Sequence, residues 1–211
     1  MEEKGMGLPR FTFVLHTHLP FVLNHGTWPH GTDWLFEAAS ECYLPLLDAF
    51  NRLLDEGYPP HVTIGLTPIL TEQLAHPAFK EGLVEYLSER VQAAEYDVQE
   101  FTVTGDNHML GLARMWLFYY SGMLEDFRDK YNQDIPGAFR ELEEKGALEI
   151  ITCAATHGYL PLIGLEESIQ AQLKQGVRTH EEYYHRHPRG IWLPESAYRP
   201  GYKWEPPINT S

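Results

Sequence analysis

The chain has 211 residues, of which 43% are apolar and 13% aromatic, enough for a packed core and against disorder. Its net charge of −14 disfavours nucleic acids and anionic membrane surfaces as partners, because both attract clusters of Lys and Arg. No apolar run approaches the roughly 18 residues of a membrane span, and the first residues lack a signal-peptide pattern. Cys42 and Cys153 are too few for a disulfide framework or a Cys-based zinc site. These features predict a soluble, cytoplasmic protein.

The order of predicted elements is an alternation of strands and helices. Runs rich in β-branched and aromatic residues predict buried strands over residues 10–15, 61–66, 147–153 and 190–193. Apolar residues at helical spacing predict a helix over about 35–53 that restarts at Pro45, and Thr67-Pro68 predicts the start of another. This order favours a parallel α/β barrel. Four strands make about half of such a barrel, so we expect the N-terminal portion of a longer enzyme.

The segment between the second and third predicted strands is unusually long. Residues from about 70 to 132 are mostly polar with helical spacing, and this exceeds what a minimal crossover needs. We therefore expect a helical insertion packed on the rim of the barrel. After it, the charged run Glu141–Glu144 is typical of a solvated helix face, in a helix that Gly146 ends.

The fourth predicted strand leads directly to a single carboxylate, Glu195. Side chains at the C-terminal ends of parallel strands carry the chemistry of α/β barrels. Pro194 restricts the backbone before Glu195, and Trp192 and Tyr198 place aromatic surfaces beside it, which suits a sugar ring. This pattern predicts a catalytic carboxylate in a carbohydrate enzyme. The plainer alternative is a structural carboxylate paired with Arg199.

Histidines follow the first and third predicted strands. His16 and His18 are separated by one residue, so in an extended strand both project to one side, where they can bind a metal or donate hydrogen bonds to hydroxyls. His157 follows the third strand and can converge with them. A zinc site usually needs a further ligand such as Asp or Glu. The spacing alone leaves metal ligands, sugar contacts and ordinary core histidines open.

Two tryptophans, Trp28 and Trp34, bracket the loop after the first strand. Exposed indoles at this place would be good platforms for the apolar faces of glucose units. Tryptophan is equally a common means of anchoring a loop on a core. The sequence leaves both interpretations open.

Four motifs in register resemble glycoside hydrolase family 57, in particular its 1,4-α-glucan branching enzymes. They are HTHLPF at 16–21, HGTWP at 25–29, THGY at 156–159 and WLPESAYRP at 192–200. The likeness continues through residues 43–47 and 67–74, so it runs in order over nearly the whole chain. Each motif alone is weak, but four in the same order are specific.

The resemblance implies a (β/α)7 barrel, of which residues 1–211 would be the N-terminal portion, acting on α-1,4-glucans with retention of configuration. No metal or organic cofactor is expected. Glu195 of the WLPE motif would be the nucleophile. Six further residues are expected to contact the glucan: His16, His18, Trp28, Trp34, His157 and Tyr198.

The acid/base of the family is an aspartate on a later strand, and no aspartate of this chain stands in that motif. We therefore expect residues 1–211 alone to be inactive, with an open barrel edge covered by the missing C-terminal portion or by a partner chain. The expected reaction is α-1,6 branching through a glucosyl ester on Glu195, with α-amylase hydrolysis and 4-α-glucanotransfer as alternatives in the family. Alternatives from other classes are a metal-dependent deacetylase or mannosidase, which would favour Asp at the position of His18, and a non-catalytic glucan-binding protein.

Overall fold

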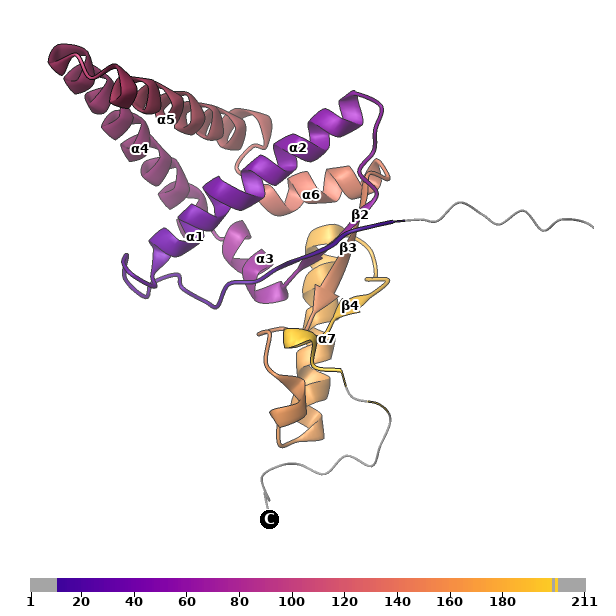
Figure 1. Cartoon of the computed structure of the whole chain (residues 1–211). Helices are drawn as coiled ribbons and strands as arrows, with labels where there is room; N and C mark the ends of the chain where they lie inside the picture. Colours follow the sequence, from indigo (N-terminus) through magenta and orange to yellow (C-terminus); the bar gives the residue numbers. More distant parts are fainter. Residues whose placement is uncertain (1–10, 199, 201–211) are drawn as a thin grey trace, which may run out of the picture.

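The structure, a computed structural model, describes residues 11–198 and 200. This part of the chain has four strands, which are all parallel and lie in sequence order: β1 (Val14–Thr17), β2 (Val62–Leu66), β3 (Leu148–Cys153) and β4 (Ile191–Trp192). Helices connect each strand to the next (Figure 1). Each parallel pair therefore needs a crossover, and the C-terminal ends of all four strands meet at one end of the sheet.

The connections differ greatly in length. Between β1 and β2 lie α1 (Thr32–Ala38), the π-helical turn η1 (Ala39–Tyr43) and α2 (Leu44–Asp55). Between β2 and β3 lie α3 (Pro68–Ala75), α4 (Pro77–Thr104), α5 (Asn107–Glu125), the π-helical turn η2 (Asp126–Lys130) and α6 (Ile135–Glu144). The 3₁₀ turn η3 (Leu160–Leu162) and α7 (Glu166–Tyr184) precede β4, and the 3₁₀ turn η4 (Pro194–Ser196) follows it.

The first strand lies further along the chain than the sequence predicts. Strand β1 begins at Val14, opposite Thr63 of β2, and ends at Thr17, whereas the prediction was residues 10–15. The side chains of Phe11 and Phe13 are 84% and 56% exposed, so this segment is not the buried strand that its composition predicts. His16 therefore lies inside the strand, not after it. The other three predicted strands are confirmed, with ends shifted by one residue.

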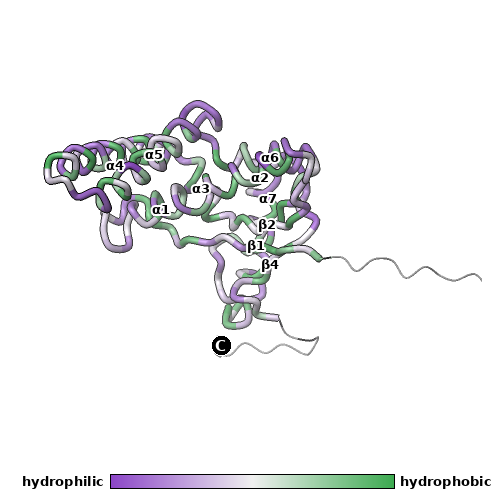
Figure 2. Tube along the Cα trace, turned by 45° about the horizontal axis from the view of Figure 1, so that its top comes forward, coloured by the Kyte–Doolittle hydropathy of each residue, from purple (hydrophilic) through white to green (hydrophobic). Residues whose placement is uncertain are grey.

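The core lies between the strands and the helices that cover them. Figure 2 shows α2, α6 and α7 on the same side of the strands. Leu44 and Leu47 of α2, Phe139 of α6 and Ile64 of β2 are fully buried in one apolar cluster. Helix α2 begins at Leu44 after the turn η1, one residue before the predicted restart at Pro45, and Pro45 is tolerated because it lies in the first turn of the helix. Over the described residues, no helix is both long and apolar enough to cross a membrane.

Helices α4 and α5 pack along each other and project away from the strands (Figure 1). The His76 side chain accepts a hydrogen bond from the Ala78 N–H at the start of α4, and Gly105, with φ of 74°, ends that helix. Asp106 then caps α5 by accepting from the Met109 N–H. Residues 70–132 are thus mostly helical. That they form an insertion on a barrel rim stays a prediction.

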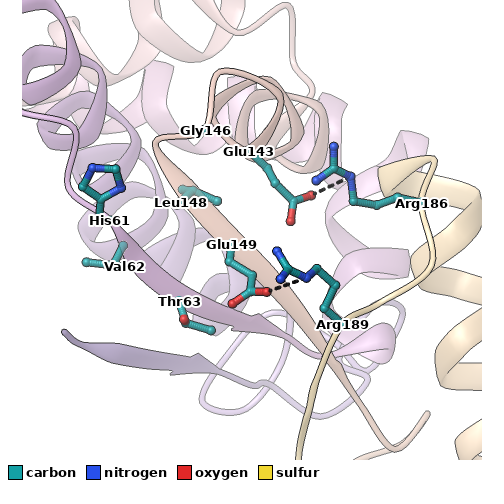
Figure 3. Close-up of a pocket in the computed structure, with 9 residues that line it drawn as sticks. All are labelled: His61, Val62, Thr63, Glu143, Gly146, Leu148, Glu149, Arg186 and Arg189. Atoms are coloured by element: carbon teal, nitrogen blue, oxygen red, sulfur yellow. Dashed lines mark ion pairs between the residues drawn. The ribbon is translucent and has the colours of Figure 1, made fainter.

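The prediction that Glu141–Glu144 form a solvated helix face is wrong for Glu143. The Glu143 side chain is 4% exposed and lies 3.5 Å from Arg186 (Figure 3). It also accepts a 2.8 Å hydrogen bond from the Ile150 N–H. Strand β4 pairs with β3 only from Thr152 onward, so Ile150 precedes the paired residues of β3 and its N–H has no acceptor in β4. A buried N–H needs an acceptor, and Glu143 supplies the one that a longer β4 would have offered.

The Glu143 carboxylate faces a cavity of about 360 Å³ at the N-terminal ends of β2 and β3. Arg186 and Arg189 border this cavity, and Arg189 lies 3.6 Å from Glu149 (Figure 3). Both arginines come from the connection between α7 and β4, so these two ion pairs tie that connection to α6 and β3. The cavity lies at the end of the sheet opposite the predicted catalytic residues.

Candidate active site

The C-terminal ends of β1, β3 and β4 bring the predicted histidines and glutamate around one cavity. His16 lies near the end of β1 and His18 just after it, His157 follows β3, and Glu195 lies in η4 directly after β4. The cavity has a volume of about 380 Å³, and its lining is His16, His18, His157, Trp192, Glu195 and Ser196. The His157 side chain is 5% exposed and the Glu195 side chain 67%. Half-buried His16 and His18 and the buried His157 side chain thus line a cavity that also holds an accessible carboxylate.

Four flat rings contact one another at this site and form its ring layer: His16, His18, His157 and Trp192. The rings of His18 and His157 stack with centroids 3.9 Å apart and planes 16° apart. The Trp192 ring stacks on His16 at 5.2 Å, and the two Nε2 atoms of His16 and His157 are 2.9 Å apart. Glu195 Oε1 lies 3.7 Å from His157 Nδ1, beyond hydrogen-bonding distance. The layer holds His157 between the other histidines and the carboxylate.

The backbone is left-handed at both functional turns. His157, Glu195 and Ser196 have φ of 56°, 55° and 52°, which costs a residue with a Cβ about 1–2 kcal/mol. The turn at Glu195 is closed by a hydrogen bond from the Ser196 N–H to the Leu193 carbonyl at 2.8 Å. Such strain concentrates at functional sites, where the surrounding fold maintains it. Here it presents the Glu195 side chain at the mouth of the cavity.

The histidines of the cavity are neutral at pH 7. The pKa values of His16 and His18 are both lowered to about 4, chiefly by burial and also by the neighbouring His157, while Glu195 opposes the shift at His16. Burial also lowers the pKa of His157, against the opposing effect of Glu195. A neutral imidazole has one N–H donor and one acceptor nitrogen. The site therefore offers sugar hydroxyls both donors and acceptors.

Two close contacts hold the ring layer on the strands. A Cβ on Gly65 of β2 would lie 3.1 Å from His16 Nδ1, so the His16 ring rests against bare backbone. The Cys153 thiol at the end of β3 donates to the Trp192 carbonyl at 3.0 Å. Cys153 is buried, as the sequence predicts for a small apolar residue in a strand.

Three predicted substrate contacts lie outside the lining of this cavity. Trp28 and Tyr198 are 74% and 70% exposed, and Trp34, in α1, is 38% exposed. The exposure of Trp28 removes the interpretation that it anchors its loop in the core. Arg199, the alternative partner for Glu195, lies outside the described residues.

Sequence reasoning missed Ser196 as a lining residue of the cavity, and it placed Trp192 beside Glu195 as an aromatic surface without counting it among the substrate contacts. The signal was available, because both belong to the same WLPES motif as Glu195. The motif does not show the partner of Trp192, because the indole stacks on His16, which lies 176 positions earlier in the chain.

The histidine rings are not arranged as metal ligands. The nitrogen lone pairs of an imidazole lie in the ring plane, so the face-to-face rings of His18 and His157 do not aim theirs at a common point. Within residues 11–198 and 200, no three His, Cys, Asp or Glu side chains are placed to hold a metal ion.

Comparison with known proteins decides the family. The sequence model described as glycosyl hydrolase family 57 matches residues 12–203. The chain belongs to this family. The resemblance seen in the motifs is thereby confirmed.

Two branching enzymes and an alpha-amylase are similar to this chain. A 1,4-alpha-glucan branching enzyme of Thermococcus kodakarensis is 45% identical over 198 residues, which are 93% of this chain and 28% of that protein. The crystal structure of a branching enzyme from Pyrococcus horikoshii matches with a TM-score of 0.88 and 42% identity, over 95% of this chain and 37% of that one. The alpha-amylase AmyC of Thermotoga maritima matches with a TM-score of 0.78 and 33% identity, over 87% of this chain and 35% of that one.

The family 57 chain described here spans between about a quarter and two fifths of the length of these relatives. Its parallel strands and helices match the N-terminal portion of their fold. The expected fold class, an α/β half-barrel, is therefore confirmed.

Proposed function

We propose that this chain contributes the nucleophile side of the active site of a 1,4-α-glucan branching enzyme, with Glu195 as the nucleophile. The observation that carries the proposal is the position of Glu195 at the end of β4, accessible at the mouth of a cavity lined by neutral imidazoles. The similar proteins named as branching enzymes supply the reaction class.

In the proposed reaction, a Glu195 carboxylate oxygen attacks C1 of a glucose unit in an α-1,4-glucan. The bond from C1 to the leaving glucan oxygen breaks, and that oxygen takes a proton from a general acid. The 6-hydroxyl of another glucan then attacks C1, gives its proton to the same group and releases Glu195. Two inversions at C1 leave an α-1,6 branch with retained configuration.

The general acid is proposed to lie in a part of the enzyme beyond this chain. A retaining enzyme holds two carboxyl groups about 5–5.5 Å apart. Among the described residues, Glu195 is the one carboxylate in the lining of the cavity. The remainder of the enzyme would add the acid/base aspartate. Without it, residues 1–211 should have no activity on glucan.

The surrounding residues have proposed roles in holding the glucan. The neutral rings of His16, His18 and His157 would line the subsite that holds the attacked sugar, where His18 could donate to or accept from a sugar hydroxyl. Trp28, Trp34 and Tyr198 would stack on further glucose units, and their exposed rings support this role. The proposed reaction uses no metal or cofactor. We also propose that the protein is cytoplasmic and that its partner is an α-glucan.

The test uses the full-length protein with Glu195→Gln, which keeps the shape of the side chain and removes the nucleophile. Transfer on amylose should fall by about 10³-fold or more, whereas Glu89→Gln, on the exposed face of α4, should change nothing. A 2-deoxy-2-fluoroglucosyl donor should label Glu195 in peptide mass spectra. Label on another residue, or near wild-type turnover of Glu195→Gln, contradicts the assignment.

Hydrolysis is the second candidate, because the alpha-amylase of Thermotoga maritima has the same fold over most of this chain. Branching and hydrolysis share the attack by Glu195 and differ in the acceptor. New α-1,6 linkages and new reducing ends, counted in one reaction on amylose, separate them. If the reaction forms more new reducing ends than new α-1,6 linkages, hydrolysis and not branching is the activity.

A further inference from the structure

The contact between His16 and His157 fixes where their protons are. Their Nε2 atoms lie 2.9 Å apart, a hydrogen-bonding distance, so one nitrogen donates and the other accepts. Both rings are neutral at pH 7, and a neutral imidazole carries one N–H. The direction of this one hydrogen bond therefore sets the tautomer of both rings.

The surroundings of the His16 ring select the direction. His16 Nδ1 is buried and has no hydrogen-bond partner among the described residues. Gly65 seals it, since even a Cβ there would be only 3.1 Å away. If His16 accepted at Nε2, its proton would lie on this sealed Nδ1, and a buried N–H without an acceptor is rarer and more costly than an unused acceptor.

The Glu195 side of His157 selects the same direction. If His157 donated from Nε2, its unprotonated Nδ1 would face the carboxylate oxygen at 3.7 Å, two acceptors opposite each other. With the opposite tautomer, an N–H faces the carboxylate. The observed distance is too long for a hydrogen bond, but such contacts commonly shorten when substrate binds.

We infer that His16 Nε2–H donates to His157 Nε2, and that this places the proton of His157 on Nδ1, directed to the Glu195 carboxylate. His16 is then a positioning residue for Glu195, acting through His157 across 141 positions of the chain. The role for Glu195 rests on the proposed function; the proton positions rest on the geometry alone. The consequence is a donor held in place to orient the nucleophile for attack on C1.

Neutron diffraction from crystals of the full-length protein, exchanged into D₂O at neutral pH, shows the protons directly. We expect deuterium on His16 Nε2 and on His157 Nδ1, with His16 Nδ1 bare. Deuterium on His16 Nδ1, or on His157 Nε2, overturns the inference. This experiment needs no substrate, so its result is separate from the fate of the proposed nucleophile.

A pair of variants tests the effect on catalysis. In His16→Gln the side-chain amide reaches the place of Nε2 and can still donate to His157; in His16→Asn the shorter amide cannot. Both variants lose any contact of the imidazole with sugar, so that loss cancels between them. We expect kcat of His16→Gln to exceed that of His16→Asn by about tenfold, the effect of one hydrogen bond to a charged or polarised partner, with similar KM. Equal kcat values would overturn the positioning role, and if the Asn variant does not fold, the neutron map decides.

Discussion

A methyl group added to Gly176 should destabilise the protein, although alanine favours helices over glycine. Gly176 lies within α7, where the helix packs on the end of β3. A Cβ at this position would overlap the Cys153 carbonyl oxygen, far inside the 3.4 Å at which ordinary contact begins. The helix or the strand must therefore move to make room for it. Neither is a flexible side-chain end that could yield at little cost.

The expected magnitude follows from opposing effects. Overpacking of this kind costs about 1–3 kcal/mol, and contact between two backbones places it at the upper end. The move also disturbs the 3.0 Å hydrogen bond from the Thr152 hydroxyl to the Gly176 carbonyl, a loss of about 1 kcal/mol. Alanine returns about 1 kcal/mol of helix propensity. We expect Gly176→Ala to lower the free energy of unfolding by about 2–3 kcal/mol.

A matched control is Gly111→Ala in α5, where nothing lies within 4 Å of the added Cβ. This variant should raise the free energy of unfolding by about 0.5–1 kcal/mol, from helix propensity alone. Urea unfolding of the full-length protein, followed by circular dichroism, measures both. If the two variants shift the midpoint in the same direction, the close packing of α7 on β3 is not what Gly176 provides.

Three further predictions concern the buried charges and the site. Glu143→Ala should lower the free energy of unfolding by about 2 kcal/mol, because it leaves the Ile150 N–H unpaired, while Glu143→Gln keeps an acceptor and should cost less; urea unfolding distinguishes them. His16 and His18 have a pKa of about 4 in the folded state and about 6.5 in the unfolded state, so between these pH values the unfolded state binds more protons. The free energy of unfolding should therefore fall as pH is lowered from about 6.5 to 4. His18→Asn should make this fall less steep, as measured by unfolding midpoints across that pH range. Trp28→Ala should raise KM for amylose severalfold with unfolding unchanged, since the ring is 74% exposed; a large fall in stability would instead show a packing role.

The elements of the sheet were predictable because their signals are local. β-branched runs give β2 and β3 within one residue, and the start of β1 was wrong because pairing with β2, not composition, decides where a strand begins. Glu143 was wrongly assigned to a solvated face because that prediction also used local composition alone. Nothing in a run of acidic residues shows that β4 is too short to satisfy the Ile150 N–H.

By itself the sequence determined that His16, His157 and Glu195 lie near or after the C-terminal ends of strands, and that these residues stand in motifs of one family, because periodicity and motif order are properties of neighbours along the chain. Only the tertiary structure decided that His16 lies 2.9 Å from His157, that Trp192 stacks on His16, and that Gly65 seals the His16 ring. The physical reason is that parallel register brings together the ends of strands separated by more than a hundred residues. Which atoms then touch depends on distances of tenths of an ångström, which no spacing along the chain encodes.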